Sequence, residues 1–287
     1  MSGFGEEAAR WLEDKLPSME ERLAALVEVN SFTENREGGN RVGALLRELF
    51  RIPGLTPAAV PSQRYADHVL FRSQGLEGAQ PVALIGHLDT VFPPGKFEGY
   101  RQDGRLRRGP GVLDMKGGLA VMAFALEALA QVRGLAALPP VRIAVVSDEE
   151  IGSPEGQGVI RDLIVGAQCA LVFEPGRTND AIVTRRKGTG AVTAVAHGKA
   201  AHAGNAHAEG SNAIWSLARF IDRVQQLTDY ARGVTVNVGK ISGGIGKNTV
   251  PDLAEAAMDI CFETGADAEA LMGTIRAAAE QSARSLP

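Results

Sequence analysis

The sequence has little cysteine, no long apolar run and no excess of basic residues, and each of these absences excludes a class of protein. Its two cysteines, Cys169 and Cys261, stand in apolar contexts without CxxC spacing, so we expect buried thiols in a reducing compartment rather than a disulfide. No apolar stretch approaches the roughly 18 residues of a membrane span. A net charge of -4, with the arginines scattered along the chain, offers no basic surface to nucleic acid.

Two catalytic motifs are missing as well. The sequence contains no GxSxG elbow of a serine hydrolase, and it lacks the GxxxxGK[ST] order of a phosphate loop, because Gly117 and Gly118 follow Lys116. Residues 1–10 carry acid where a signal peptide needs base, so we expect a cytoplasmic protein without a membrane segment. The length of 287 residues and the hydrophobic share of 45% instead predict one or two ordinary globular domains.

Helical and strand periodicities alternate through the first two thirds of the chain. We predict helices over residues 6–29, broken into two near Pro17, over 42–50 after a polar turn at 31–40, and over 117–129, with strands over 68–73, 82–85, 141–146 and 170–173. The segment 82–85 is fully apolar, and the segments 141–146 and 170–173 are similar runs, as expected of strands buried on both faces. This alternation predicts an α/β domain over residues 1–184, in which helices cover both faces of a mostly parallel sheet.

The pattern changes after residues 185–188. We predict strands over 190–197, 233–242 and 253–262, and helices over 211–227 and 267–283. This β-α-β-β-α order is that of a ferredoxin-like α+β unit without its closing strand. We therefore expect a second, incomplete domain over residues 185–287.

Acidic side chains and one histidine follow the predicted strands at the points where these strands end. They are His87 and Asp89 in GHLDTV, Asp114 in GPGVLDMKGG, Glu149 and Glu150 in SDEEIGS, and Glu174 in FEPG. The carboxyl ends of parallel strands meet at one edge of an open sheet, so these donors are expected to assemble a metal site. The run of adjacent acids is the strongest single indication, because neighbouring carboxylates repel each other unless a cation or a proton relieves them.

Most of these residues have a simpler interpretation when each is taken alone. His87 would be a surface histidine at a capped strand end, Asp114 a helix N-cap and Glu174 a solvated loop acid. Asp89, two residues after His87, is spaced to accept the second ring N–H and to fix the tautomer of the imidazole. Their joint occurrence favours the metal site.

These motifs, together with GKAAHAG further on, resemble those of the M20 family of zinc metallopeptidases and deacylases from about Leu23 to Thr274. The family includes glutamate carboxypeptidases, acetylornithine deacetylase and succinyl-diaminopimelate desuccinylase. The resemblance implies two zinc ions bridged by Asp114 and a water or hydroxide. One ion would take His87 and Glu174, and the other would take Glu150 and a histidine from near the family's C-terminus.

The resemblance also assigns residues outside the ligand set. Glu149 would be the general base, and the Asp114–Met115 peptide bond is expected to be cis. Residues 185–287 would be the family's lid, which forms a homodimer. Within it, His202 matches the histidine that stabilises the oxyanion in the partner's active site, and Asn248 matches an asparagine that contacts the carboxylate end of the substrate. Without the motifs, both would be ordinary turn residues.

Two features depart from the family pattern. Cys261 stands where many members have an arginine, and no histidine follows His207, which we interpret as a surface residue. We therefore expect the second metal position to lack a ligand and some strand edges and apolar surface to be uncovered. Either the chain is a truncated form of an active hydrolase, or it is a shortened relative that binds or dimerises without catalysis. A third hypothesis is completion by a separately encoded fragment.

The substrate prediction is a small peptide or an N-acyl amino acid. The segment VNSFTEN and the motif spacing look closest to the glutamate carboxypeptidases, which cleave an amide next to a C-terminal acidic residue. An N-acyl amino acid deacylase or an aminopeptidase is the enzymatic alternative. Histidine and carboxylate ligands are compatible with zinc, cobalt or manganese. From the missing ligand we expect weak or no hydrolysis by these 287 residues alone.

Overall fold

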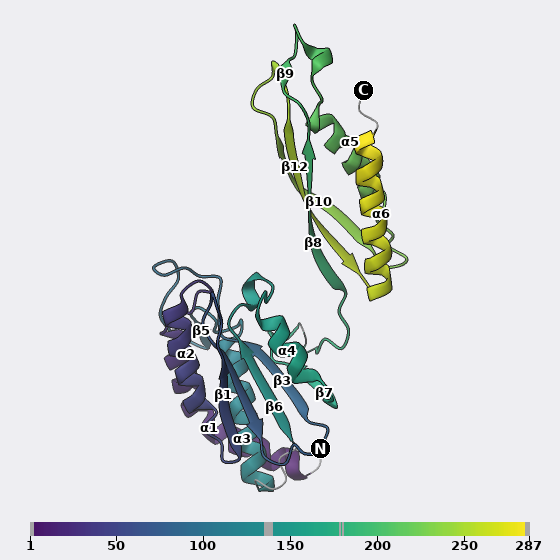
Figure 1. Ribbon diagram of the computed structural model, residues 1–287. Helices are drawn as coiled ribbons and strands as arrows, with labels where there is room; N and C mark the ends of the chain where they lie inside the picture. Colours follow the sequence, from purple (N-terminus) through teal and green to yellow (C-terminus); the bar gives the residue numbers. More distant parts are fainter. Residues whose placement is uncertain (1–2, 135–139, 178, 180, 285–287) are drawn as a thin grey trace. The chain divides into compact units, whose positions relative to one another are not determined.

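The chain divides into two compact units, Met1–Asp180 and Ala181–Pro287, each with its own hydrophobic core. The computed structural model, drawn in Figure 1, describes residues 3–134, 140–177, 179 and 181–284. The sequence patterns place the boundary between the units a few residues later, after residue 184. Within the described residues, no helix combines the length and the apolar character needed to cross a membrane.

The first unit is built on a five-stranded sheet. Its strands are β1 (Leu55–Val60), β2 (His68–Ser73), β3 (Val82–His87), β6 (Val141–Val146) and β7 (Cys169–Val172), in the order β1-β2-β6-β3-β7. Strand β3 is parallel to both of its neighbours, whereas β2 is antiparallel to β1 and β6. Four strands thus run in one direction, which confirms the prediction of a mostly parallel sheet. Strand β1 was not predicted.

Helices cover both faces of this sheet, as predicted. The helices are α1 (Gly3–Val27), α2 (Arg36–Leu49), α3 (Lys116–Arg133) and α4 (Gly156–Ile164). Successive strand residues point to opposite faces. Accordingly, Val69 and Ile143 join a core with the first three helices, while Leu70 and Ala144 join a smaller core with Leu163 of α4. Figure 1 shows α4 apart from α1, α2 and α3 across the sheet.

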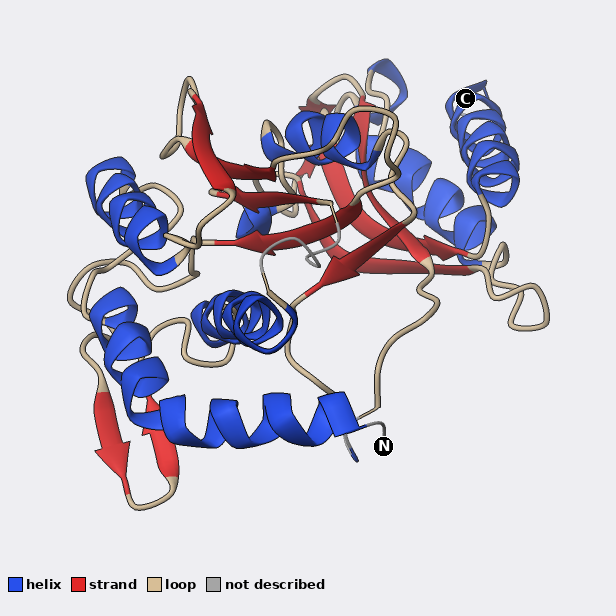
Figure 2. Ribbon diagram, turned by 90° about the horizontal axis from the view of Figure 1, so that it is seen from below, coloured by secondary structure: helices blue, strands red, loops and turns tan. Residues whose placement is uncertain are grey.

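Several boundaries differ from the prediction. The helix α1, drawn beside the N-terminus in Figure 2, is a single helix that continues through Pro17, because apolar residues before and after the proline pack on the core. Helix α2 begins inside the predicted polar turn, because the Asn35 side chain accepts a hydrogen bond from the Gly38 N–H and caps it. The short hairpin β4 (Arg101–Asp103) and β5 (Leu106–Arg108) was missed, since its charged residues show no apolar alternation.

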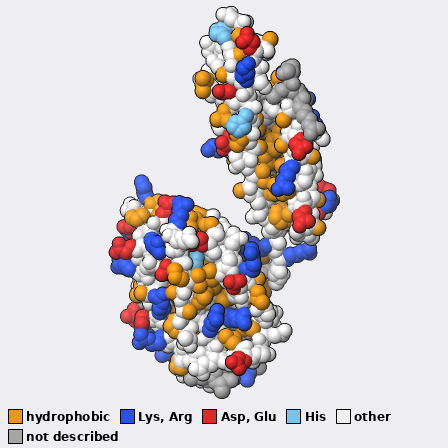
Figure 3. Space-filling model, in the orientation of Figure 1, with side chains coloured by type: hydrophobic (Ala, Val, Ile, Leu, Met, Phe, Trp, Pro, Cys, Tyr) orange, Lys and Arg blue, Asp and Glu red, His pale blue; other side chains and the backbone are white. Residues whose placement is uncertain are grey.

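Strand β7 contradicts the prediction that it is buried. It lies at the edge of the sheet and its four residues are exposed, including Leu171 and Val172. Cys169 is exposed and Cys261 is half-buried, so the prediction of two buried thiols was wrong. An apolar run predicts a strand but does not reveal whether another element covers it. Uncovered apolar surface was expected, and Figure 3 shows apolar side chains gathered on the visible face of this unit.

The second unit has the predicted β-α-β-β-α order. Its main elements are β8 (Gly188–His197), α5 (Ala213–Gln225), β10 (Thr235–Gly243), β12 (Leu253–Phe262) and α6 (Gly265–Arg284). The three strands form an antiparallel sheet in the order β10-β12-β8. Alternate residues of β12, such as Met258 and Ile260, are buried in a core with the two helices. A separate small sheet pairs β9 (Ala201–His202) with β11 (Thr249–Val250).

The first turn of α3 lies unusually close to the segment that follows β7. At Gly118, a Cβ atom would stand only 2.0 Å from the carbonyl oxygen of Phe173. This backbone oxygen cannot move aside without shifting the chain just before Glu174. Gly118, the last glycine of the GPGVLDMKGG motif, therefore permits a close approach that positions the candidate ligand Glu174.

We predict that Gly118→Ala lowers the free energy of unfolding by about 1–3 kcal/mol, because overpacking against backbone forces the strand end away. Gly158 in α4 is the matched control, since a Cβ there would meet nothing within 4 Å. Gly158→Ala should raise stability by about 0.5–1 kcal/mol through helix propensity. Urea unfolding of both variants measures the difference, and equal effects would contradict the close-approach argument.

Candidate metal centre

His87 is the centre of the candidate site. It is the last residue of β3, between β6 and β7, and its side chain is 1% exposed. Its Nδ1 atom lies 3.1 Å from the backbone oxygen of Asp89 and 3.3 Å from Asp89 Oδ1. Because Nδ1 faces two acceptors, the neutral ring carries its proton there and directs the free lone pair of Nε2 outward. The imidazole is thus oriented as a metal ligand.

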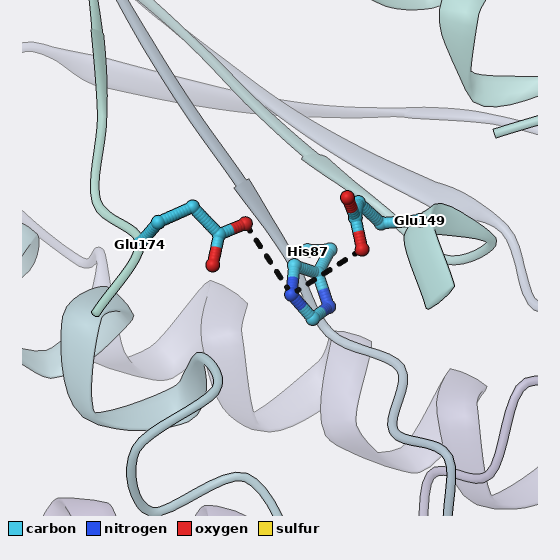
Figure 4. A group of neighbouring side chains, drawn as sticks. All are labelled: His87, Glu149 and Glu174. Atoms are coloured by element: carbon cyan, nitrogen blue, oxygen red, sulfur yellow. Dashed lines mark ion pairs between the residues drawn. The ribbon is translucent and has the colours of Figure 1, made fainter. Parts of the chain in front are cut away.

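Carboxylates from three other segments surround the Nε2 atom. Asp114 Oδ1 lies 3.0 Å away, Glu174 Oε1 3.6 Å and Glu149 Oε2 3.9 Å. Figure 4 shows Glu149 and Glu174 approaching the ring from different sides. They come from the 3-10 turn η2 (Glu149–Ile151) after β6 and from the segment after β7. The carboxyl ends of neighbouring parallel strands therefore deliver the donors to one place, as the sequence suggested.

The donor atoms form two overlapping groups of metal-ligand size. One group contains His87, Glu149 and Glu174, and the other contains His87, Asp114 and Glu150, with all ligand atoms of a group within 4.8 Å of one another. The four predicted metal ligands and the predicted base thus lie together. Distance alone does not separate ligand from base, since Glu149 belongs to one of the groups.

The electrostatics of the cluster fit a bound cation. Burial lowers the pKa of His87, but the hydrogen bond to Asp89 and the charges of Asp89 and Glu174 raise it overall to about 9. Burial, with Asp114 nearby, raises the pKa of Glu174 to about 7, and burial also raises the pKa of Glu150. Burial and mutual repulsion thus disfavour the charged form of these carboxylates, and a bound divalent cation would favour it. One imidazole with several carboxylates suits zinc, cobalt or manganese.

Asp114 occupies a special backbone position. The peptide bond to Met115 is cis, as the family resemblance implied. The simpler interpretation of Asp114 as a helix N-cap was wrong, because Met115 is the N-cap of α3 and the Asp114 carboxylate contacts His87 instead. Lys116 is fully buried and donates hydrogen bonds from Nζ to the backbone oxygens of Leu26 and Val29, both 3.0 Å away. Lys116 therefore serves the end of α1 rather than a phosphate.

Asp89 has more partners than the sequence predicted. Besides His87, it accepts hydrogen bonds from the backbone N–H groups of Glu149 and Glu150, each at 3.2 Å. The same carboxylate thus orients the histidine and the turn that carries two acids. The neighbouring Asp148 does not join the cluster through hydrogen bonds, since its Oδ2 accepts from the N–H groups of Glu155 and Gly156 at the start of α4.

His202 and Asn248 lie in the second unit, where β9 and β11 bring them together. Both are exposed, and the Ala203 N–H donates to the Asn248 backbone oxygen at 2.9 Å. His202 Nδ1 accepts from the N–H groups of Gly204 and Asn205, each at 3.1 Å. The neutral ring then carries its proton on Nε2, which makes that atom a hydrogen-bond donor. His207 is exposed, as expected of a surface residue.

Comparisons with known proteins agree with this architecture. Carboxypeptidase G2 from Pseudomonas sp. (strain RS-16) is 28% identical over 273 residues, which cover 93% of this chain and 65% of that protein. The aminopeptidase PepT from Bacillus cereus has a TM-score of 0.75 at 22% identity, covering 93% of this chain and 72% of that one. For the M20 family metallo-carboxypeptidase Sso-CP2 from Sulfolobus solfataricus, the TM-score is 0.70 at 18% identity, with coverages of 92% and 75%. These solved structures share the fold.

The smaller α+β unit also matches a known family by itself. The family model of the M20 peptidase dimerisation domain matches residues 184–286. Residues 184–286 thus form an M20 peptidase dimerisation domain, and the chain as a whole is a homologue of carboxypeptidase G2. The chain spans 51–65% of the length of four curated relatives that it matches.

We predict that adding Zn²⁺ or Co²⁺ raises the thermal unfolding midpoint, because a cation that binds the folded state stabilises it, by about 2.7 kcal/mol at 100 times its Kd. His87→Ala should abolish the shift, since both donor groups share this residue. His207→Ala, which changes an exposed histidine in the second unit, should leave the shift intact. Calorimetry with and without metal gives the result, and a metal-induced shift that persists in His87→Ala would refute this site.

Proposed function

We propose that this chain is a metal-dependent hydrolase that cleaves an amide bond of a small peptide or an N-acyl amino acid. One observation carries the proposal: carboxylates from three other segments meet around the buried imidazole of His87, with the ligand atoms of each group within 4.8 Å of one another. Such a cluster of carboxylates costs stability unless it binds a cation. Its position at the carboxyl ends of parallel strands is where active sites of open α/β sheets lie.

We assign two metal ions to this cluster, most simply zinc, and Asp114 would contribute to both positions. His87 and Glu174 would complete one position and Glu150 the other. Two bound ions would lower the pKa of a water molecule and polarise the scissile carbonyl group. The 3.0 Å approach of Asp114 to His87 and the proximity of Glu150 support this arrangement.

Glu149 is the proposed general base. The Glu149 N–H is fixed by Asp89, while its side chain is 47% exposed and so remains accessible to substrate. It would accept a proton from the attacking water and later donate a proton to the leaving amine. Asp89 would keep the proton of His87 on Nδ1 throughout, which preserves the lone pair on Nε2.

The second unit supplies the remaining proposed contacts. We assign His202 Nε2 as a donor to the oxyanion that forms in the active site of a partner copy, and Asn248 as a contact to the carboxylate end of the substrate. The similarity to carboxypeptidase G2 favours an amide at the C-terminal end of a substrate, and the motif resemblance to glutamate carboxypeptidases favours an acidic residue there. An N-acyl amino acid deacylase or an aminopeptidase is the alternative. Cytoplasmic location stays a prediction from sequence composition.

A second candidate function is a dimerising or binding relative without catalysis. The small number of ligands at the second metal position favours it. If His87 binds the first metal ion, the donor group for the second ion retains only Asp114 and Glu150 among the described residues. Tight binding of a catalytic zinc usually takes three protein ligands. We therefore expect slow hydrolysis from these residues alone. The non-catalytic hypothesis predicts a stable dimer that holds at most one metal ion per chain.

We predict that Glu149→Gln lowers any metal-dependent hydrolysis by about 10²- to 10⁴-fold, because proton transfer is lost. Metal content should stay unchanged. Dipeptides with a C-terminal glutamate, N-acetyl amino acids and peptides with a free N-terminus form the assay panel, in excess Zn²⁺. Glu155→Gln is the matched control, since this half-buried acid in the same segment binds the backbone N–H groups of residues 63 and 64 and lies outside both donor groups. Equal rates for the wild type and Glu149→Gln would contradict the proposed catalytic role.

We further predict a homodimer, so light scattering should give about twice the chain mass of 30.3 kDa. If His202 acts in the site of the partner, a mixture of Glu149→Gln and His202→Ala chains should regain up to about a quarter of wild-type activity. After random exchange of chains, half of all dimers contain one chain of each variant. Each of these dimers has one intact site, which combines Glu149 of one chain with His202 of the other. A monomer, or no recovery beyond the sum of the separate variants, would refute the shared site.

A further inference from the structure

The carboxylate of Asp89 has a fourth partner that the sequence patterns did not reveal. Its Oδ2 atom accepts a hydrogen bond from Thr33 Oγ1 at 2.8 Å, shorter than the bonds from the N–H groups of Glu149 and Glu150. Asp89 is 1% exposed and Thr33 is 3% exposed, so the bond is shielded from water. A hydrogen bond to a buried carboxylate is among the stronger kinds in proteins.

The backbone holds the Thr33 hydroxyl in place. Residues 31–33, between α1 and α2, form a parallel bridge with the segment after β3, in which Phe32 pairs with Thr90. The Thr33 N–H donates to the Thr90 oxygen at 3.2 Å, and the Thr90 N–H donates to the Ser31 oxygen at 2.9 Å. Thr33 therefore reaches Asp89 from a segment that is itself fastened to the loop following His87.

We propose that Thr33 is a positioning residue of the metal centre: its hydroxyl fixes the carboxylate of Asp89 so that the two oxygens serve His87 and the turn of Glu149 and Glu150 at once. The inference rests on the proposed metal site. A carboxylate turns about its terminal bond with little resistance, so its neighbours set its plane. With the Thr33 donor in place, Oδ2 is committed to Thr33 and Glu150, and Oδ1 to His87 and Glu149.

Ser31 provides a matched comparison within the same bridge. Its hydroxyl is also buried, and it donates to the backbone oxygen of Leu88 at 2.7 Å. This bond fastens the segment but does not touch Asp89. If Thr33 only fastened the segment, removing either hydroxyl would have the same consequence. If Thr33 orients Asp89, only its removal would disturb the metal ligands.

The test compares metal binding by Thr33→Val, Thr33→Ser and Ser31→Ala in the full chain. Thr33→Val keeps the shape but removes the donor, and it should weaken Zn²⁺ and Co²⁺ binding about tenfold, the lower end for residues that support metal ligands. It should also change the visible absorption of bound Co²⁺. Thr33→Ser retains the hydroxyl and should bind like the wild type. Ser31→Ala should lower the unfolding midpoint while leaving the affinity and the spectrum unchanged.

Wild-type affinity in Thr33→Val would overturn the inference, and so would equal weakening in Ser31→Ala. If Thr33→Val does not fold, Thr33→Ala, which also lacks the donor but is smaller, replaces it in the same comparison. Wild-type protein that binds neither Zn²⁺ nor Co²⁺ would instead refute the metal site itself. Chelator competition measures the affinities, and circular dichroism confirms the fold of each variant.

Discussion

The contact between the His87 ring and Asp89 is the constraint on which the candidate site depends. A buried histidine at the end of a central strand would be costly if its ring nitrogens lacked partners. Asp89 satisfies Nδ1 and, through its other contacts, ties the ring to the turn after β6. The opposite nitrogen is thereby left facing the carboxylates. One side chain pair thus couples the end of β3 to the end of β6.

The topology of the sheet brings the other carboxylates of the site close to His87. Strands β6, β3 and β7 are parallel neighbours, so the segments that leave their carboxyl ends lie side by side. Asp114 arrives by a different route, from the turn before α3, whose glycine-rich start passes against the segment after β7. The glycines of this motif, which resemble a phosphate loop in composition, serve close packing instead. The close approach of these backbone segments therefore brings the acidic residues of separate motifs to one place.

Much of this could be predicted from the sequence, and the failures have physical causes. Strands β2 and β6 were predicted at their observed bounds, because residues that favour strands, such as valine, isoleucine and phenylalanine, are concentrated in both segments. The hydrogen bond from Thr33 to Asp89 was missed, since a lone threonine in a polar segment carries no periodic signal and its partner lies 56 residues away. The burial of β7 was wrong for a related reason. The local sequence pattern indicates the secondary structure of a segment, whereas contacts with distant parts of the chain determine whether the segment is buried.

The charged groups of this unit have two different kinds of surroundings, and these separate a structural role from a functional one. Burial lowers the pKa of Lys116 to about 7, yet its Nζ donates to two backbone oxygens near the end of α1. Such a lysine has a structural use, because it satisfies carbonyl groups that a helix end leaves free. Around His87 the charges instead have the same sign, and the pKa values of Glu150 and Glu174 are raised. Repelling groups contribute nothing to the fold on their own, so their arrangement is explained by the cation that they would bind.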